Sequence, residues 1–130
     1  MNAEIKQLWV DALRSGDYTQ GQGGLKTATG YCCLGVLCEL HRIHTGQGEW
    51  IGQGEYANRI YRSNSEEVSI FLGEEVYSWA GTNSNPDVKC FNGVYSLSTL
   101  NDGQVLDING VQDFRQLKFN QIADLIEEQL

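Results

Sequence analysis

A stripe of apolar residues at helical spacing opens the chain. Its members lie three or four positions apart, with charged and amide residues between them: Ile5, Leu8, Trp9, Ala12 and Leu13. Ser15-Gly16 follows and puts glycine at the usual end position of a helix. The pattern predicts an amphipathic helix over residues 3–14 that buries one face.

The stretch from Gly30 to Leu40 is the longest nearly uncharged run, with Glu39 as its one carboxylate. Apolar side chains would cover almost every direction around a helix here, so such a helix would be buried on most sides. A short buried strand over 31–33 that runs into a helix over 34–44 is the alternative. Because cysteine packs as a small hydrophobe, three cysteines within seven positions indicate a tight interior contact. We expect the core to be organised around this stretch.

The middle of the chain carries a repeated glycine-rich pattern. The two echoes, Gly46-Gln47-Gly48-Glu49-Trp50 and Gly52-Gln53-Gly54-Glu55-Tyr56, predict a tight hairpin with aromatic residues at matching places. A short strand over 58–62 follows. Two short helices are predicted next, over 65–72 and 74–80, and a glycine ends the second.

The last third of the chain alternates around two Asn-Gly dipeptides. Asn92-Gly93 and Asn109-Gly110 favour hairpins over residues 88–95 and 104–112. A helical turn or two is expected over 96–102. A final apolar stripe predicts a helix from about Asn120 to the end.

These elements together predict an α+β fold in which helices pack on short antiparallel strands. A chain of 130 residues with 41% hydrophobic residues is long enough to bury one core, so we expect a single globular domain over 1–130.

Charge and the amino terminus narrow the class of partner and the compartment. The net charge is −8, from 17 acidic against 9 basic residues, which opposes direct binding to a nucleic-acid backbone. The sequence begins without a basic segment followed by an apolar one, and it holds no apolar run of about 20 residues. We therefore expect a cytosolic protein with reduced thiols and no contact with a membrane.

Cysteine and histidine supply the candidates for metal binding and covalent catalysis. Cys38 and His41 are three apart and would share one face of a helix, as paired metal ligands must. Structural zinc sites usually combine two ligand pairs from separate segments, and of the cysteines only Cys90 lies outside residues 32–38. The preferred interpretation is that the thiols are buried and inert, without a bound metal or other cofactor. A Cys38 nucleophile activated by His41 is the enzymatic alternative.

One cluster of residue types suits a small ligand. Aromatic faces stack on bases and guanidinium groups bind phosphates, so this combination fits a nucleotide-like molecule. The predicted ligand-binding residues are Trp50, Tyr56, Arg59, Tyr61 and Arg62. The same composition is also found on ordinary half-exposed hairpins and at protein interfaces.

Several segments resemble a family of small, uncharacterised proteins of tailed bacteriophages. The matching segments are Trp9-x-x-Ala12-Leu13-x-Ser15-Gly16-x-Tyr18-x-Gln20, Gly30-Tyr31-Cys32-Cys33-Leu34-Gly35-Val36-Leu37-Cys38, Val76-x-x-Trp79-Ala80-Gly81, Leu100-Asn101-Asp102 and Ile122-Ala123-Asp124-Leu125-Ile126-Glu127. In that family the Asn-Asp turn runs almost directly into the last helix, whereas residues 103–118 intervene here. The resemblance implies a phage origin, a location in the host cytosol and an inserted hairpin. It assigns no catalytic residue.

These observations favour an accessory binding protein over an enzyme. Its partner would be a small nucleotide-like ligand, such as a nucleotide-derived immune signal, or a host or defence protein that it inhibits. A small hydrolase that depends on Cys38 and His41 or on a metal, and a virion structural or assembly protein, are the alternatives. A homodimer through exposed faces of the terminal helices is also expected, because symmetric dimers are the commonest assembly.

Overall fold

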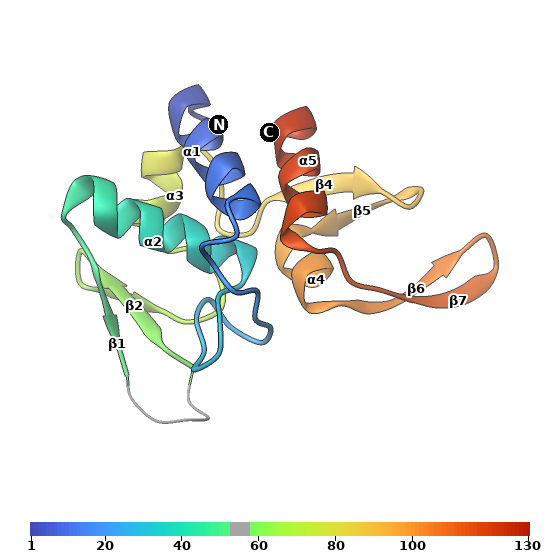
Figure 1. Ribbon diagram of the computed structural model, residues 1–130, viewed down its shortest axis with the longest axis horizontal. Helices are drawn as coiled ribbons and strands as arrows, with labels where there is room; N and C mark the ends of the chain where they lie inside the picture. The colour runs from blue at the N-terminus through green and yellow to red at the C-terminus, as the bar shows by residue number, and fades with distance from the viewer. Residues whose placement is uncertain (53–57) are drawn as a thin grey trace.

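The structure is a computed structural model that describes residues 1–52 and 58–130 (Figure 1). Its described part contains five helices: α1 (Ala3–Arg14), α2 (Cys33–Thr45), α3 (Glu74–Ala80), α4 (Leu97–Asp102) and α5 (Phe119–Gln129). The strands are β1 (Glu49–Ile51), β2 (Ile60–Ser63), β3 (Glu66–Val68), β4 (Asp87–Cys90), β5 (Gly93–Ser96), β6 (Gln104–Ile108) and β7 (Val111–Arg115). These described strands pair antiparallel with one another, and the predicted α+β fold is confirmed.

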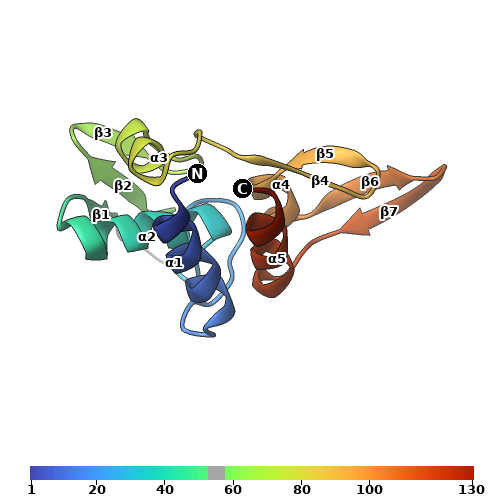
Figure 2. The ribbon, with the colours of Figure 1, turned by 90° about the horizontal axis from the view of Figure 1, so that it is seen from above.

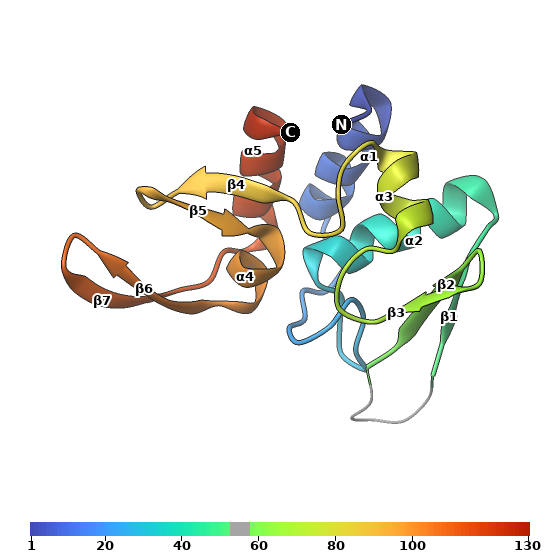
Figure 3. The same cartoon turned by 180° about the vertical axis from the view of Figure 1, so that it is seen from behind.

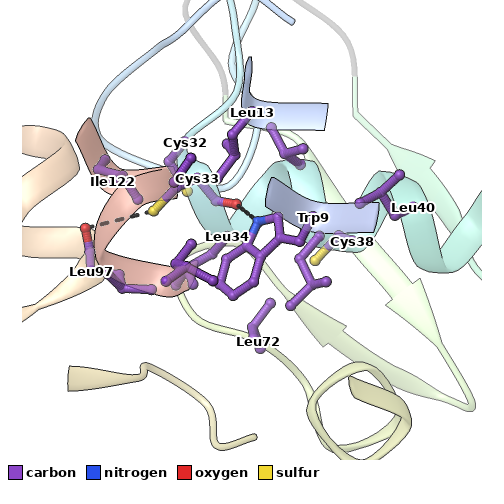
Figure 4. Close-up of a cluster of buried hydrophobic side chains, with 14 of the residues drawn as sticks. Trp9, Leu13, Cys32, Cys33, Leu34, Cys38, Leu40, Leu72, Leu97 and Ile122 are labelled. Atoms are coloured by element: carbon purple, nitrogen blue, oxygen red, sulfur yellow. Dashed lines mark hydrogen bonds between the residues drawn. The ribbon is translucent and has the colours of Figure 1, made fainter. Parts of the chain in front are cut away.

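Helix α2 forms the centre of the core. Every residue from Cys33 to His41 is buried, which fits a helix with apolar side chains in almost all directions. The structure decides between the two alternatives for this stretch, since the helix begins at Cys33 and Tyr31 makes isolated bridges to Gln20 and Lys26. Trp9 of α1 packs against the helix and donates a hydrogen bond from its indole Nε1 to the carbonyl of Cys33, at 2.9 Å (Figure 4).

A glycine allows the loop before α2 to lie directly on the helix. A Cβ atom added to Gly35 would stand 1.7 Å from the carbonyl oxygen of Leu25, far inside van der Waals contact. Leu25 is fully buried beneath this contact, and its carbonyl accepts a hydrogen bond from the backbone N–H of Cys32. The close approach of the loop at Leu25 therefore requires a residue without a side chain at position 35 of α2.

A buried carboxamide joins this loop to the second half of the chain. Asn101 of α4 accepts hydrogen bonds at Oδ1 from the Cys33 backbone N–H (3.1 Å) and from Gln20 Nε2 (3.0 Å). Its Nδ2 donates to the carbonyl of Gly21 at 2.8 Å. Buried polar groups need such partners, because each unsatisfied one costs about 1–3 kcal/mol. Asn101 thus holds α2, α4 and the loop in one arrangement.

The remaining elements surround α2 on opposite sides. Helices α1 and α5 lie side by side, with the two termini at the same end (Figure 2). The three-stranded sheet has the order β1-β2-β3 and lies near α2 and α3. The hairpins β4–β5 and β6–β7 extend away from the helices on the side of α4 and α5 (Figure 3).

Two predictions about the middle of the chain need correction. The helix over 65–72 is wrong, because Asn64 and Ser65 adopt positive φ angles of 50° and 67° and turn the chain into strand β3. In the next hairpin the two turn residues are Phe91 and Asn92, one position before the predicted Asn-Gly pair, because Cys90 pairs with Gly93. Most of the second glycine-rich echo lies outside the described residues; in the first echo, Trp50 of β1 lies opposite Tyr61 of β2.

The other predicted helices and the last predicted hairpin are confirmed. The helices over 3–14 and 74–80 match α1 and α3, and α4 and α5 appear near their predicted positions. Asn109-Gly110 forms the predicted two-residue turn, with φ angles of 54° and 82°, and the strands on either side continue to Gln104 and Arg115.

We expect Gly35→Ala to destabilise the protein although alanine normally strengthens a helix. The new methyl group would collide with the Leu25 carbonyl, and overpacking typically costs about 1–3 kcal/mol. Chemical denaturation of the variant gives the free energy of unfolding. His44→Ala on the exposed side of the same helix is the control, and equal effects of the two substitutions would contradict the close contact.

Candidate functional site

The predicted ligand-binding residues on the three-stranded sheet separate into two faces. Trp50 and Tyr61 are cross-strand partners, so their side chains share one face, and their ring centroids lie 4.8 Å apart. Tyr61 is buried, whereas Trp50 is half-buried. Trp50 therefore forms the accessible surface, and Tyr61 lies behind it.

Arg62 lies on the opposite face of the sheet. Neighbouring residues of a strand point to opposite sides, and the cross-strand partner of Arg62 is Glu49. Its guanidinium forms ion pairs with Glu49 at 3.3 Å and with Glu67 at 2.8 Å. Arg62 therefore does not join Trp50 and Tyr61. The predicted residue Tyr56 lies outside the described residues.

The loop before α2 adds two residues that the sequence did not single out. The backbone N–H of Arg59 donates to the carbonyl of Lys26 at 2.8 Å, which places Lys26 beside the sheet. The Lys26 ammonium lies 5.0 Å from the ring centroid of Tyr31 and 5.2 Å from that of Trp50. We refer to Lys26, Tyr31, Trp50 and Arg59 as the aromatic–cationic surface.

Two donors on the aromatic–cationic surface have unused capacity. Among residues 1–52 and 58–130, the Lys26 ammonium has no carboxylate within ion-pair distance. The indole Nε1 of Trp50 is buried and has no hydrogen-bond acceptor among these residues. An unsatisfied buried donor is uncommon in proteins and often marks a place where water or a ligand completes the bonding.

Tyr31 links this surface to a buried carboxylate. Its hydroxyl donates to Glu39 Oε2 at 3.4 Å, and Glu39 also forms an ion pair with Arg42. Burial, followed by the nearby charge of Glu39, raises the pKa of Tyr31 above its ordinary value. Tyr31 therefore stays protonated at neutral pH and presents an uncharged aromatic ring next to Lys26.

Behind Trp50 a buried polar network crosses the core. His41 is 1% exposed, and its Nδ1 lies 2.7 Å from the Tyr61 hydroxyl. Its Nε2 lies 3.6 Å from Oε1 of Glu75, whose other oxygen accepts a hydrogen bond from Ser63. Burial lowers the pKa of His41, and the Glu75 carboxylate offsets only part of this effect. The imidazole is consequently neutral at pH 7.

The cysteines and His41 do not form the reactive pair or the metal site that the sequence offered as alternatives. Burial raises the pKa of Cys32 to about 11 and those of Cys33 and Cys38 well above the ordinary thiol value. The two His41 nitrogens face Tyr61 and Glu75. Within the described residues, no group of three histidine, cysteine, aspartate or glutamate side chains could hold a metal ion. A nucleophile must be a thiolate that substrate can reach, and Cys38 is fully buried.

Comparison with protein families now places the chain. A family model described as a domain of unknown function, DUF8296, matches residues 1–130. The chain belongs to the DUF8296 family. No curated protein and no solved structure matches this DUF8296 chain. In the part of the chain that the structure describes, no helix combines the length and the apolar character needed to cross a membrane.

We expect the cysteines of the native protein to be largely unreactive toward a chromogenic thiol reagent. Cys32, Cys33 and Cys38 are buried, so only the half-buried Cys90 should react, and a denaturant should expose all four thiols. Cys90→Ser should remove the native signal. Rapid modification of Cys38 in the folded protein would instead revive the nucleophile hypothesis.

We expect the stability of the protein to fall on acidification below about pH 6.5 because of His41. Its pKa is lowered in the folded state, so its contribution is complete above the unfolded pKa and is lost as the pH falls through the folded pKa. His41→Gln should flatten the curve of unfolding free energy against pH in this range. His44→Gln, at the exposed histidine of the same helix, should retain the slope.

Proposed function

We propose that this DUF8296 protein is a binding protein that captures an anionic, planar, nucleotide-like ligand on its aromatic–cationic surface. The observation that carries the proposal is the Lys26 ammonium, which is held over two aromatic rings without a carboxylate partner in the described residues. A cation in this position is ready to bind a phosphate, while the adjacent rings offer faces on which a base can stack.

Arg59 and the unpartnered indole support the same ligand class. The Arg59 backbone is hydrogen-bonded to Lys26, so a second cationic side chain starts from the neighbouring position. A guanidinium binds phosphate through two parallel hydrogen bonds, which an ammonium does not do. The buried Nε1 of Trp50 would gain an acceptor if ligand binding rearranged its surroundings. The net charge of −8 makes such a local cationic surface selective, because an anion is repelled elsewhere.

The biological setting of the proposal is a tailed phage that infects a bacterium. The segments that resemble the phage family motivate this setting, and the ligand class then suggests capture of a nucleotide-derived immune signal in the host cytosol. The buried thiols and the neutral, enclosed His41 favour binding over catalysis.

Native mass spectrometry of the protein purified from expressing bacteria tests whether a ligand is present. The expected spectrum contains an added mass that matches a small nucleotide. Isothermal titration with nucleoside monophosphates, cyclic mononucleotides and cyclic dinucleotides then measures affinity. A bare protein that binds none of these compounds would refute the ligand and direct attention to an inhibited host protein.

Variants of the aromatic–cationic surface locate the binding site. Lys26→Met keeps the aliphatic packing and removes the charge, so it should lower affinity at least about 10-fold, because a hydrogen bond to a charged group contributes about 1.5–3 kcal/mol. Trp50→Phe, which keeps a ring and removes the indole N–H, should weaken binding as well. Arg62→Ala on the other face of the sheet is the matched control, and an equal loss in Arg62→Ala and Lys26→Met would contradict the assigned surface.

A further inference from the structure

Hairpin β6–β7 carries large apolar side chains that are more than half exposed. Val105 and Phe114 are cross-strand partners and are 58% and 60% exposed, and Val111 near the tip is 63% exposed. Within the described residues, β6 and β7 pair only with each other, so each strand has an unpaired edge. A two-stranded hairpin with open edges is marginally stable in water, and exposed edges are templates for pairing with another strand.

The turn determines which backbone groups face the open edge of β7. A two-residue turn at Asn109 and Gly110 makes Ile108 and Val111 a hydrogen-bonded pair. The backbone groups of residues 111, 113 and 115 therefore point toward β6. Those of Gln112 and Phe114 point outward, toward any strand that lies alongside.

The charges on β7 identify the strand that fits this edge. We propose that the chain forms a symmetric homodimer in which β7 pairs antiparallel with β7 of a second copy, with the two-fold axis at Phe114. In this register Asp113 of each copy lies opposite Arg115 of the other, and Gln112 lies opposite Gln116. The outward N–H and C=O groups of the two Phe114 residues then form a reciprocal pair of hydrogen bonds.

Other registers and the other edge fit less well. An axis at Asp113 would place two carboxylates directly opposite each other, and like charges in that position destabilise a sheet. If β6 paired with β6 of a second copy about Leu106, Asp107 would lie opposite Val105. Strand β6 contains no cation that could pair with Asp107. The complementary arrangement about Phe114 is symmetric, as an interface between two identical copies must be.

The dimer would also extend the apolar outer face of hairpin β6–β7. Val105 and Phe114 share the outer face of the hairpin, so the four-stranded sheet would carry Val105, Phe114 and the same two residues of the second copy in one row. Arg115 lies on the inner face, where its guanidinium carbon is 5.2 Å from the centroid of the Phe91 ring. Asp113 Oδ2 forms an ion pair with Arg115 Nη2 at 2.8 Å. Both charged side chains are partly exposed, Arg115 to 43% and Asp113 to 46%, so neither is closed off from a counterpart in the second copy.

Sedimentation velocity at moderate salt tests the dimer. The expected species has twice the 14.5 kDa mass of one chain. Arg115→Asp places a carboxylate of one copy opposite Asp113 of the other, so this variant should be a monomer. The double variant Asp113→Arg/Arg115→Asp restores both pairs of opposite charge and should recover the dimer. Lys89→Asp on the neighbouring hairpin is the charge-matched control and should remain dimeric. A monomeric wild type, a dimeric Arg115→Asp variant or a monomeric double variant would overturn the proposal.

Cysteine cross-linking tests the register even if a charge variant folds poorly. Residues of a hydrogen-bonded antiparallel pair have Cα atoms about 5.5 Å apart, within the range of about 4.4–6.8 Å that a disulfide spans. In a Cys90→Ser background, Phe114→Cys should oxidise to a covalent dimer because residue 114 lies on the axis. Asp113→Cys should stay monomeric on a denaturing gel. Cross-linking at 113 and not at 114 would overturn the register.

Discussion

The close contact between the Leu25 carbonyl and the Cα of Gly35 is the constraint on which the rest of the structure depends. It holds the loop of residues 17–31 against the buried helix α2. On the other side, Gln20 and Gly21 of the loop make four hydrogen bonds to Asn101, Leu117 and Phe119. Because Lys26 directly follows Leu25, the same contact positions the Lys26 ammonium near the rings of Tyr31 and Trp50. The aromatic–cationic surface is thus a consequence of how the core closes.

The sequence predicted the elements whose signals are local. The apolar stripe of α1 and the Asn109-Gly110 turn are decided within a few residues, and both were located correctly. The segment 65–72 failed because its apolar residues suggested a helix, whereas Asn64 and Ser65 adopt left-handed backbone angles and start a strand that pairs with β2. In this segment, pairing with strand β2 outweighed the local helix propensity.

The candidate site was only partly accessible from the sequence. Trp50, Arg59 and Tyr61 were named for their chemistry, and alternation along a strand could have shown that Arg62 faces away from Tyr61. Lys26 and Tyr31 could not have been found in this way. Their positions depend on a contact between a loop and a helix, and a glycine among apolar residues does not reveal what lies against it.

The hairpin β6–β7 is tied to the core at adjacent points. The backbone N–H of Leu117 donates to the carbonyl of Leu100, so the chain returns next to the place from which it leaves. A segment anchored in this way can lengthen, shorten or be replaced while α4 and α5 keep their positions. If hairpin β6–β7 varied among members of the family in this way, the dimer proposed above would vary with it, while the core around α2 would keep its packing.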